Sequence, residues 1–512
     1  MDIKRSVKTM LSKVKDFISG KRGLLILAVL INAAFGFYPA PLFDEDEGFT
    51  AEVAREMLER KEFVLLESNF EPRYDKPPLA FWLIAGSLYL FGNNEFAVRF
   101  PGICASVLLQ YLLYAFVRKR YGEKRAVTTG ILVAGTLQFT LMSKSAIADP
   151  FLYLFITAAI LGLIDFAESG RRKYLYLFMV CNALAFLTKG PVALFISGTA
   201  VLTVLFYRRE PAFLRRVLHP LPLLVFFALV LPWFVLSYGK VGLLMIEEFF
   251  FKHNLGRFSQ PMEGHDGSWL YYFIVFLVGF LPFSFSHIYG LFRAVQTKTD
   301  LTERVCLVWF TAVFLLFSFS ATKLPHYLMP GFFPLVVVSS RYFSQKGQRV
   351  SGIFAAGLIF LLLTIPLTAQ RVAPEIPDEY VRLLLAGFPA VFGPLYYGVQ
   401  AVCLAGALYS IRKRNTVFVL FFLVSVNSAL VAYSWVQQGP VRELSRVVNT
   451  GIVMRNHYLP SFSFYRQQAY PVREPVAGEY SVGKISDFRN YDYEILYEKY
   501  GLVWVKIKGL MK

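Results

Sequence analysis

Charged residues and cysteines are both scarce in this chain of 512 residues. Only 17% of the residues are charged whereas 56% are hydrophobic, and a soluble core of this length cannot bury so many apolar side chains. The excess apolar surface predicts a membrane protein. The four cysteines lie far apart in apolar stretches, without CxxC or Cys/His spacing, so we interpret them as small buried apolar residues.

Two further absences narrow the function. No convincing glycine-rich loop of the nucleotide-binding kind is found, so no nucleotide cofactor is expected. Acidic residues number 35 against 53 basic residues, which gives a formal net charge of +18. The basic residues recur in short clusters between apolar runs, where a membrane protein places its cytoplasmic loops. We therefore expect no nucleic-acid partner.

Apolar runs of membrane-spanning length recur through the first 436 residues. A helix that crosses roughly 30 Å of hydrocarbon needs about 20 mostly apolar residues, and on this basis we predict about 13 transmembrane helices. The predicted spans are 23–40, 95–117, 126–142, 150–167, 174–188, 191–207, 220–238, 269–289, 303–320, 325–340, 351–367, 390–410 and 415–436.

Basic residues concentrate in every second connection between these runs, for example at 118–125 and 412–414. Cytoplasmic loops carry such an excess, so these connections and the N-terminus are predicted to be cytoplasmic, in an inner (cytoplasmic) membrane. The longer connections, including 41–94 and 239–268, then lie outside. The tail after residue 436 lies outside too.

The predicted fold is an all-α polytopic membrane domain over 1–436, followed by a small extracytoplasmic α/β domain over 437–512. Within the first outer connection, 49–60 repeats apolar side chains every four residues, and 79–91 is apolar but short for a span. Both segments are expected to be helices at the membrane interface.

Four adjacent carboxylates, Asp44, Glu45, Asp46 and Glu47, directly follow the first predicted span. Such a cluster repels itself unless it is solvated, paired or bound to a cation. One interpretation is an ordinary acidic loop. The other is a general base at the membrane surface, able to take a proton from an acceptor hydroxyl or amine.

A second outer carboxylate, Asp149, precedes Pro150 at the start of the fourth predicted span. Proline is favoured in the first helical turn, so Asp149 is a candidate N-cap. Capping alone explains its presence. If that helix begins beside the first outer connection, Asp46 and Asp149 could also hold one acceptor group between them.

Three outer lysines, Lys76, Lys189 and Lys323, stand beside proline or glycine. A lysine at a membrane boundary commonly extends its ammonium group into water and nothing more. The alternative is that the three lysines clamp a phosphate, with Arg257 as a fourth cation.

Two histidines, His253 and His265, share the connection 239–268, and their spacing matches no structural zinc motif. Both are interpretable as polar loop residues. The other hypothesis is a divalent-cation site that combines one of them with Glu71 or Asp75 from the first outer connection.

These motifs resemble, in order, those of the polyprenyl-phosphate-dependent glycosyltransferases of the GT-C fold, specifically the lipid A aminoarabinose transferase and protein O-mannosyltransferase group. The matching segments are DEGFTAEVAREML from Asp46, DKPPLAFWL from Asp75, LTKGP and KLPHYLMP, within about the first 340 residues. The resemblance implies transfer of a sugar from a polyprenyl (undecaprenyl) phosphate to an acceptor at the outer leaflet, with inversion at the anomeric carbon. The register favours Asp46 over Asp44 as the catalytic aspartate.

The resemblance also implies residue roles. The catalytic set is Asp46 with Glu47 and Asp149, and the set for the donor phosphate is Lys76, Lys189, Arg257 and Tyr327, to which we add Lys323. Asp75 or Glu71, together with His253 or His265, would bind a divalent cation such as Zn, Mg or Mn. The family carries a basic residue and a tyrosine after the Asp-Glu pair, where this chain has Phe49 and Thr50. One phosphate contact is therefore expected to be missing or relocated.

The acceptor is expected to be lipid A or another envelope lipid. The alternatives are a protein O-mannosyltransferase-like enzyme, a non-catalytic scaffold, and a lipid flippase or transporter. A transporter should have ionisable residues near the centres of its spans and repeated halves, whereas the charges here lie mainly at span ends.

Overall fold

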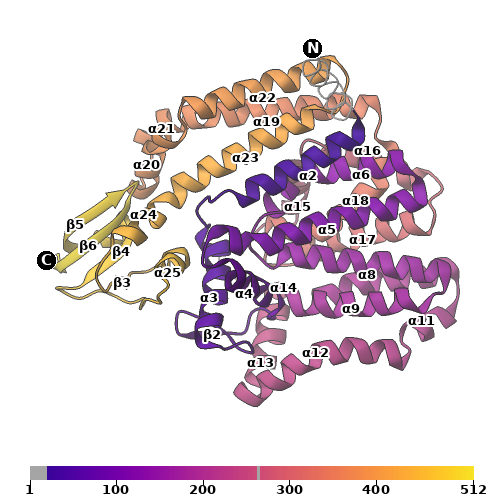
Figure 1. Cartoon of the computed structure of the whole chain (residues 1–512), viewed down its shortest axis with the longest axis horizontal. Helices are drawn as coiled ribbons and strands as arrows, with labels where there is room; N and C mark the ends of the chain where they lie inside the picture. The colour runs from indigo at the N-terminus through magenta and orange to yellow at the C-terminus, as the bar shows by residue number, and fades with distance from the viewer. Residues whose placement is uncertain (1–19, 262–265, 512) are drawn as a thin grey trace, which may run out of the picture.

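The long helices of the chain lie side by side, with the C-terminal strands at one end of them, in a computed structural model that describes residues 20–261 and 266–511 (Figure 1). Seven of the described helices are long and apolar enough to cross a membrane. They are α5 (Glu95–Tyr121), α8 (Asp149–Ser169), α12 (Pro220–Val241), α17 (Leu301–Phe319), α19 (Gln345–Val372), α22 (Pro394–Arg412) and α23 (Phe418–Gln437).

One further apolar segment is bent, and it is either a broken span or a re-entrant loop. α15 (Tyr271–Gly279) and α16 (Ser284–Gln296) qualify only together, and they meet at an angle of 113°. The chain is thus a multi-pass membrane protein, but the predicted count of thirteen is not confirmed. Further apolar helices pack among the long ones: α2 (Lys21–Phe37), α6 (Glu123–Ala134), α7 (Leu137–Met142), α9 (Arg172–Lys189), α10 (Val192–Arg208) and α18 (Met329–Ser339).

One predicted span, 126–142, is broken between α6 and α7. Thr136 adopts an extended conformation, and the amide of Leu137 donates to the carbonyl of Leu281 (2.8 Å) instead of continuing the helix. A Cβ on Gly135 would lie 2.7 Å from a methyl carbon of Val419, so the break brings the chain against α23. The break turns α7 toward the outer connection.

The first outer connection folds into a compact layer of helices and a hairpin. Its elements are η1 (Asp44–Gly48), α3 (Phe49–Arg60), β1 (Leu66–Ser68), β2 (Glu71–Arg73) and α4 (Leu79–Phe91). The helices predicted over 49–60 and 79–91 are therefore present. Three charged side chains of α3, Glu52, Arg55 and Glu56, are buried. Arg55 Nε donates to Glu52 (2.7 Å), which compensates both charges.

Residues 439–510 form a mixed helix and sheet region that packs on this layer. The sheet has the order β3-β4-β6-β5, with β3 parallel to β4 and the other neighbours antiparallel. Its elements are α24 (Gly439–Val447), β3 (Val453–Met454), α25 (Pro460–Arg466), β4 (Tyr480–Lys484), η6 (Ile485–Phe488), β5 (Tyr491–Lys499) and β6 (Leu502–Leu510).

The remaining described helices are short and lie in connections. They are α11 (Pro211–Val217), α13 (Leu244–Ile246), η2 (Glu247–Gly256), α14 (Arg257–Ser259), η3 (Pro325–Leu328), η4 (Ser340–Tyr342), η5 (Ala373–Glu375), α20 (Glu379–Ala386) and α21 (Phe388–Val391).

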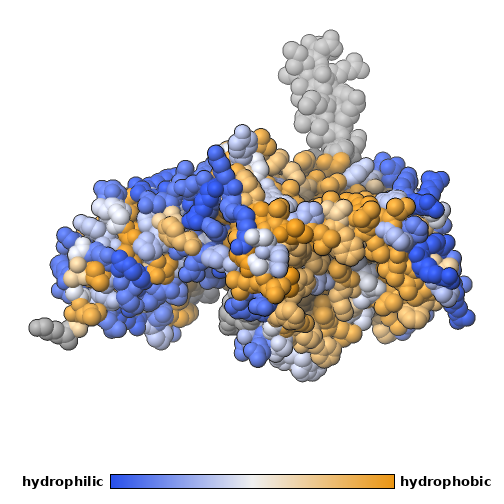
Figure 2. All heavy atoms as spheres, turned by 90° about the horizontal axis from the view of Figure 1, so that it is seen from below, coloured by the Kyte–Doolittle hydropathy of each residue, from blue (hydrophilic) through white to orange (hydrophobic). Residues whose placement is uncertain are grey.

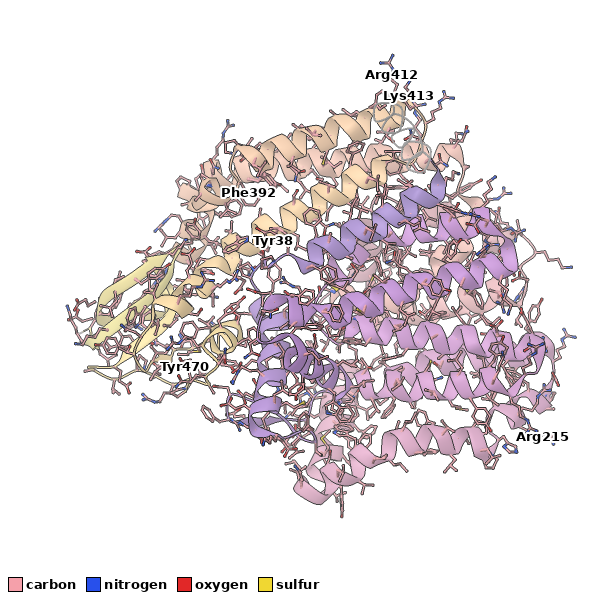
Figure 3. The ribbon with its side chains drawn as sticks, viewed as in Figure 1. Tyr38, Arg215, Phe392, Arg412, Lys413 and Tyr470 are labelled. Carbon is pink, nitrogen blue, oxygen red and sulfur yellow. The ribbon has the colours of Figure 1, made fainter. Side chains whose placement is uncertain are left out.

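Hydrophobic and hydrophilic surfaces separate along the helices. In Figure 2 a broad hydrophobic area covers the helical part, with hydrophilic residues over the C-terminal region on the left and at the far right end. Arg412 and Lys413 at the end of α22, and Arg215 in α11, lie at one end of the helices, while Tyr470 of the C-terminal region lies at the other (Figure 3). Residues of two basic clusters therefore lie at the same end.

Candidate active site

Residues from seven distant parts of the sequence line one cavity of 930 Å³ beneath the first outer connection. The lining includes two of the three proposed catalytic carboxylates, without Glu47, four of the five proposed phosphate-binding residues, and Asp75: Asp46, Asp149, Lys76, Lys189, Arg257, Tyr327 and Asp75. A cavity of this size lies within the range of small-molecule sites. The hypothesis of a catalytic site requires these residues to lie close together, and the fold brings them to one cavity.

The four carboxylates of η1 have different surroundings. Asp44 is buried against the C-terminal region, where its Oδ1 accepts a hydrogen bond from the amide of Ser461 (2.8 Å). Burial raises the pKa of Asp44 to about 6, and this hydrogen bond opposes the rise only in part. Asp46 and Glu45 instead line the large cavity. Only these two carboxylates of η1 face the substrate space.

Glu47 is engaged in a buried ion pair. Its Oε2 lies 2.6 Å from Arg99 Nη2, and its Oε1 accepts from the amide of Ala146 (3.1 Å). Both side chains are almost fully buried, with 5% and 7% exposure. A paired carboxylate is a poor proton acceptor, so the geometry assigns Glu47 to holding η1 against α5 and the α7–α8 connection.

Asp149 forms the centre of a second buried cluster. Lys189 Nζ lies 2.8 Å and 2.9 Å from its two carboxylate oxygens, and His326 Nε2 lies 3.8 Å from Oδ2. The expectation that Asp149 caps α8 is wrong. The helix begins at Asp149 itself, Ala148 occupies the cap position, and no side chain caps the helix. Asp149 instead fixes the ammonium group of Lys189 at the cavity wall.

His326 lines the same cavity from the short helix η3. Burial lowers its pKa, although the nearby Asp149 carboxylate acts in the opposite direction. The sequence analysis quoted this histidine within KLPHYLMP but did not single it out. Its position directly after a proline at a helix boundary was a signal that could have found it.

A second group of cations surrounds Asp75. Burial alone would raise the pKa of Asp75, but Lys76 and Arg73 outweigh it and hold the pKa at about 2. The guanidinium carbon of Arg73 lies 4.6 Å from the ring centre of Phe49, and Lys76 Nζ lies 6.0 Å from it. Cations above an aromatic face are attracted to it. Phe49 therefore orients two cations at the cavity rim.

Arg257 and Tyr327 meet across the cavity wall. Arg257 Nη1 lies 3.5 Å from the Tyr327 hydroxyl, and Lys189 Nζ lies 4.8 Å from the centre of the same ring. The carbonyl of Arg257 accepts from the amide of Thr322 (3.1 Å), which ties α14 to the segment after α17. Hydrogen-bond donors of Arg257, Tyr327 and Lys189, which come from three separate elements, therefore lie close together at the cavity wall.

Lys323 does not line the large cavity. Its ammonium group donates to the carbonyls of Ser318 (2.9 Å), Ser320 (2.8 Å) and Phe317 (3.4 Å), at the end of α17. The last carbonyls of a helix have no partners within the helix, so a lysine satisfies them well. Lys323 is therefore a helix-capping residue in this fold, and its proposed contact with a phosphate has no geometric support.

The proposed metal ligands do not assemble into a site within 20–261 and 266–511. No group of three or more His, Cys, Asp and Glu side chains that could hold a metal ion is found there. Glu71 lies exposed in β2 and does not line the cavity. His253 lies in η2 with its Nε2 3.6 Å from Glu248, and His265 lies outside the described residues. We assign no catalytic step to a metal ion.

The C-terminal region contributes Tyr458 and Pro460 to the cavity wall. Neither residue was expected there, because about 400 residues separate them from the outer connection that they cover. Nothing in their local sequence signals a site. Arg73 and Gln138 are two further lining residues that the sequence analysis did not select.

A smaller cavity of 190 Å³ adjoins the other side of η1 and also has Asp46 in its wall. Apolar side chains of α2, α7 and α23 make up most of its lining, together with Lys144. Burial, and then the charge of Arg99, lower the pKa of Lys144 to about 7. Asp46 is thus the carboxylate that borders both a cationic cavity and a largely apolar one.

Comparisons with known proteins show what the chain is similar to. A family model described as dolichyl-phosphate-mannose-protein mannosyltransferase matches residues 75–236. The undecaprenyl phosphate-alpha-4-amino-4-deoxy-L-arabinose arabinosyl transferase of Edwardsiella ictaluri (strain 93-146) is 29% identical over 422 residues, and the match covers 75% of each chain. An uncharacterized protein of Aquifex aeolicus (strain VF5) is 28% identical over 344 residues, or 66% of each chain.

A solved structure shares the fold over almost the whole chain. The crystal structure of ArnT from Cupriavidus metallidurans bound to undecaprenyl phosphate matches with a TM-score of 0.76, covering 94% of this chain and 97% of that one, at 18% sequence identity. The comparisons confirm the sequence-based resemblance to polyprenyl-phosphate-dependent glycosyltransferases of the aminoarabinose transferase type. The chain is a glycosyltransferase with the GT-C fold.

Proposed function

We propose that this glycosyltransferase moves a sugar from an undecaprenyl-phosphate-linked donor to an acceptor at the outer face of the inner membrane, with Asp46 as the general base. The observation that carries the proposal is the single cavity that joins the Asp46 carboxylate to several cations from distant elements. The named relatives, which are arabinosyl transferases using an undecaprenyl-phosphate sugar, support the donor class.

The cations suit a leaving phosphate. Lys76, Arg73 and Arg257, with the hydroxyl of Tyr327, supply positive charge and donors on one wall of the cavity. Lys189 is neutralised by Asp149 but still directs its ammonium group to the same wall. Preorganised donors of this kind stabilise the charge that grows on the phosphate as the bond to the sugar breaks.

The reaction is a single displacement. The acceptor hydroxyl or amine attacks the anomeric carbon, Asp46 takes the proton of that group, and the bond from the anomeric carbon to the phosphate oxygen breaks. The phosphate keeps the electron pair and leaves as a polyprenyl phosphate held by the cations. Attack opposite the leaving group inverts the anomeric carbon.

The acceptor in this proposal is lipid A or another envelope lipid. The small cavity beside Asp46 favours an acceptor with an apolar portion, since most of its lining is apolar, although Lys144 and Arg99 also line it. The match of residues 75–236 to protein mannosyltransferases favours a second candidate, a protein acceptor. In both cases the proposal puts the N-terminus in the cytoplasm and the C-terminal region outside.

The decisive experiment replaces Asp46 with Asn, which keeps the side-chain shape and removes the base. In membranes or purified protein, D46N should lose transfer by at least about a hundredfold, since a positioned general base contributes about that much or more. Binding of undecaprenyl phosphate should persist. D44N is the matched control and should stay active, because Asp44 faces Ser461 and not the cavity. A fully active D46N enzyme would refute the assignment of the base.

A further inference from the structure

A second cavity with basic walls lies at the end of the helices opposite the active site. It measures 300 Å³ and is lined by residues of five segments, including Lys21, Lys124, Arg125, Arg341, Gln348 and Thr416. The path of α18 separates the two cavities: η3 before this helix lines the active site, and Ser340 and Arg341 after it line the basic cavity. The basic cavity is therefore no part of the site already described.

Positive charge exceeds negative charge around this cavity. Arg125 and Arg341 share one carboxylate, Glu303, with a distance of 2.8 Å in each pair. Another carboxylate, Asp300, accepts a hydrogen bond from the hydroxyl of Tyr121 (2.8 Å). The side chains of Lys21 and Lys124 have no hydrogen bond or ion pair with any described residue. Even with both carboxylates counted, two positive charges remain uncompensated.

The cavity is preorganised and not merely a basic surface. Arg125 is fixed by a hydrogen bond to the carbonyl of Val337 (2.8 Å), and its guanidinium carbon stacks 3.8 Å from the ring centre of Tyr121. Glu303 holds both arginines, whereas Lys21 and Lys124 are exposed and have no carboxylate partner among the described residues, so these two ammonium groups are the ones available to a ligand. Two ammonium groups facing one pocket suit a phosphate group.

We propose that this cavity binds the phosphate headgroup of an anionic phospholipid. A phospholipid is favoured over free phosphate because the cavity opens between the ends of apolar helices, where a membrane has its headgroups, and because Ile131 and Phe343 add apolar wall. Basic pockets between membrane helices are known to hold anionic headgroups. The site is independent of the proposed sugar transfer, so either proposal can fail alone.

The test measures thermal unfolding of the full chain in detergent as phosphatidylglycerol, phosphatidylcholine or inorganic phosphate is added. Phosphatidylglycerol should raise the melting temperature of the parent protein and of the control R412A/K413A, whose charges lie at the same end but do not line the cavity. K21A/K124A should need at least about tenfold more phosphatidylglycerol for the same shift. K21R/K124R should restore the response.

Three results would overturn the proposal. The first is an unchanged response of K21A/K124A to phosphatidylglycerol. The second is an equal response of the parent protein to phosphatidylcholine, which carries no net charge. The third is an equal shift with inorganic phosphate at matched concentration, which would make the ligand a free anion and not a lipid. If K21A/K124A does not fold, K21Q/K124Q serves in its place, with the number of retained phospholipids measured by native mass spectrometry.

Discussion

At the scale of single residues, the consecutive carboxylates of η1 differ in function because they differ in partners. Asp44 meets a backbone amide and Glu47 meets a guanidinium group, while Asp46 borders two cavities. A base must be reached by the group that it deprotonates. Among residues 44–47, Asp46 is the one that lines both cavities, and this observation is independent of the motif register.

Arg73 offers a test of the relocated phosphate contact. The sequence-based resemblance predicts a basic residue after the Asp-Glu pair, where this chain has Phe49, and Arg73 stacks on that phenylalanine at the cavity rim. Because Arg73 is 39% exposed, its contact with a phosphate is worth less than a buried one. R73A should raise KM for the donor by about tenfold and lower kcat as well, because Arg73 also faces the charge that grows on the leaving phosphate.

The control for Arg73 is Arg60, a cation of the same outer layer that lies over Phe70 and does not line the cavity. R60A should leave donor KM unchanged, and R73K should recover part of the affinity. Steady-state kinetics with a lipid-linked donor checks all three variants. An unchanged KM of the R73A enzyme would show that Arg73 does not contact the donor phosphate.

Asp44 gives a prediction about pH and stability. The pKa of Asp44 is about 6 in the folded protein, whereas the ordinary value for an aspartate, which applies to the unfolded chain, is 3.8. Between these two pH values the Asp44 carboxyl is protonated in the folded protein and ionised in the unfolded chain. The free energy of unfolding therefore falls by roughly 3 kcal/mol as the pH rises from about 4 to about 6. Above pH 6 it stays at this lower value. D44N removes this penalty and should raise the melting temperature at pH 7 to 8.

The same substitution should have no stabilising effect near pH 4, where Asp44 is protonated in the folded protein. The introduced asparagine can still accept from the amide of Ser461, and its own amide can donate to Gln438 Oε1, which has no hydrogen-bond partner among the described residues. Melting curves of D44N and the parent protein across this pH range provide the check. A constant difference at all pH values would contradict the assigned cause.

At the scale of secondary-structure elements, the contact between η1 and α25 depends on one glycine. A Cβ on Gly48 would lie 2.9 Å from both the amide nitrogen and the Cβ of Ser461. Such overpacking forces the elements apart and typically destabilises a protein by about 1 to 3 kcal/mol. G48A should therefore loosen the C-terminal region and expose it to limited proteolysis.

The matched control is Gly86 in α4, where an added Cβ meets nothing within 4 Å. G86A should leave proteolysis unchanged, and it should even stabilise α4 slightly because alanine is the better helix former. If G48A resists proteolysis as well as the parent protein, the close approach of α25 does not hold the C-terminal region in place.

Comparison of the predicted with the observed helices shows which features of the fold can be predicted from the sequence. Segments 49–60 and 79–91 were predicted because their periodicity and length are local properties, and both are helices. The break between α6 and α7 was missed, since it depends on a carbonyl of Leu281 and a side chain of Val419 far along the chain. Periodicity contains no information on such distant partners.

The same distinction applies to the site residues. Lys76, Lys189 and Arg257 were selected by motif, and all three line the cavity. Lys323 has an equally suggestive sequence context, but its ammonium group satisfies helix-end carbonyls. Tyr458 was not predicted because its approach to the cavity depends on the docking of α25, which no local pattern encodes.

At the scale of the whole molecule, the C-terminal region covers one end of the helices (Figure 1), and the basic residues Arg215, Arg412 and Lys413 lie at the other (Figure 3). Because cytoplasmic loops of membrane proteins are rich in lysine and arginine, the basic end should face the cytoplasm. The active-site cavity, lined in part by the C-terminal residues Tyr458 and Pro460, then opens on the outer side. This orientation is a property of the entire chain and can be tested with two positions.

The test introduces single cysteines at Lys413 and Arg489, both exposed, in a variant whose four native cysteines are replaced by alanine. Lys413 follows α22 at the basic end, and Arg489 follows η6 in the C-terminal region. A thiol reagent that cannot cross membranes should label R489C in cells whose inner membrane is intact. It should label K413C only after that membrane is made permeable. The reverse pattern would put the active site in the cytoplasm, where a donor presented at the outer leaflet could not reach Asp46.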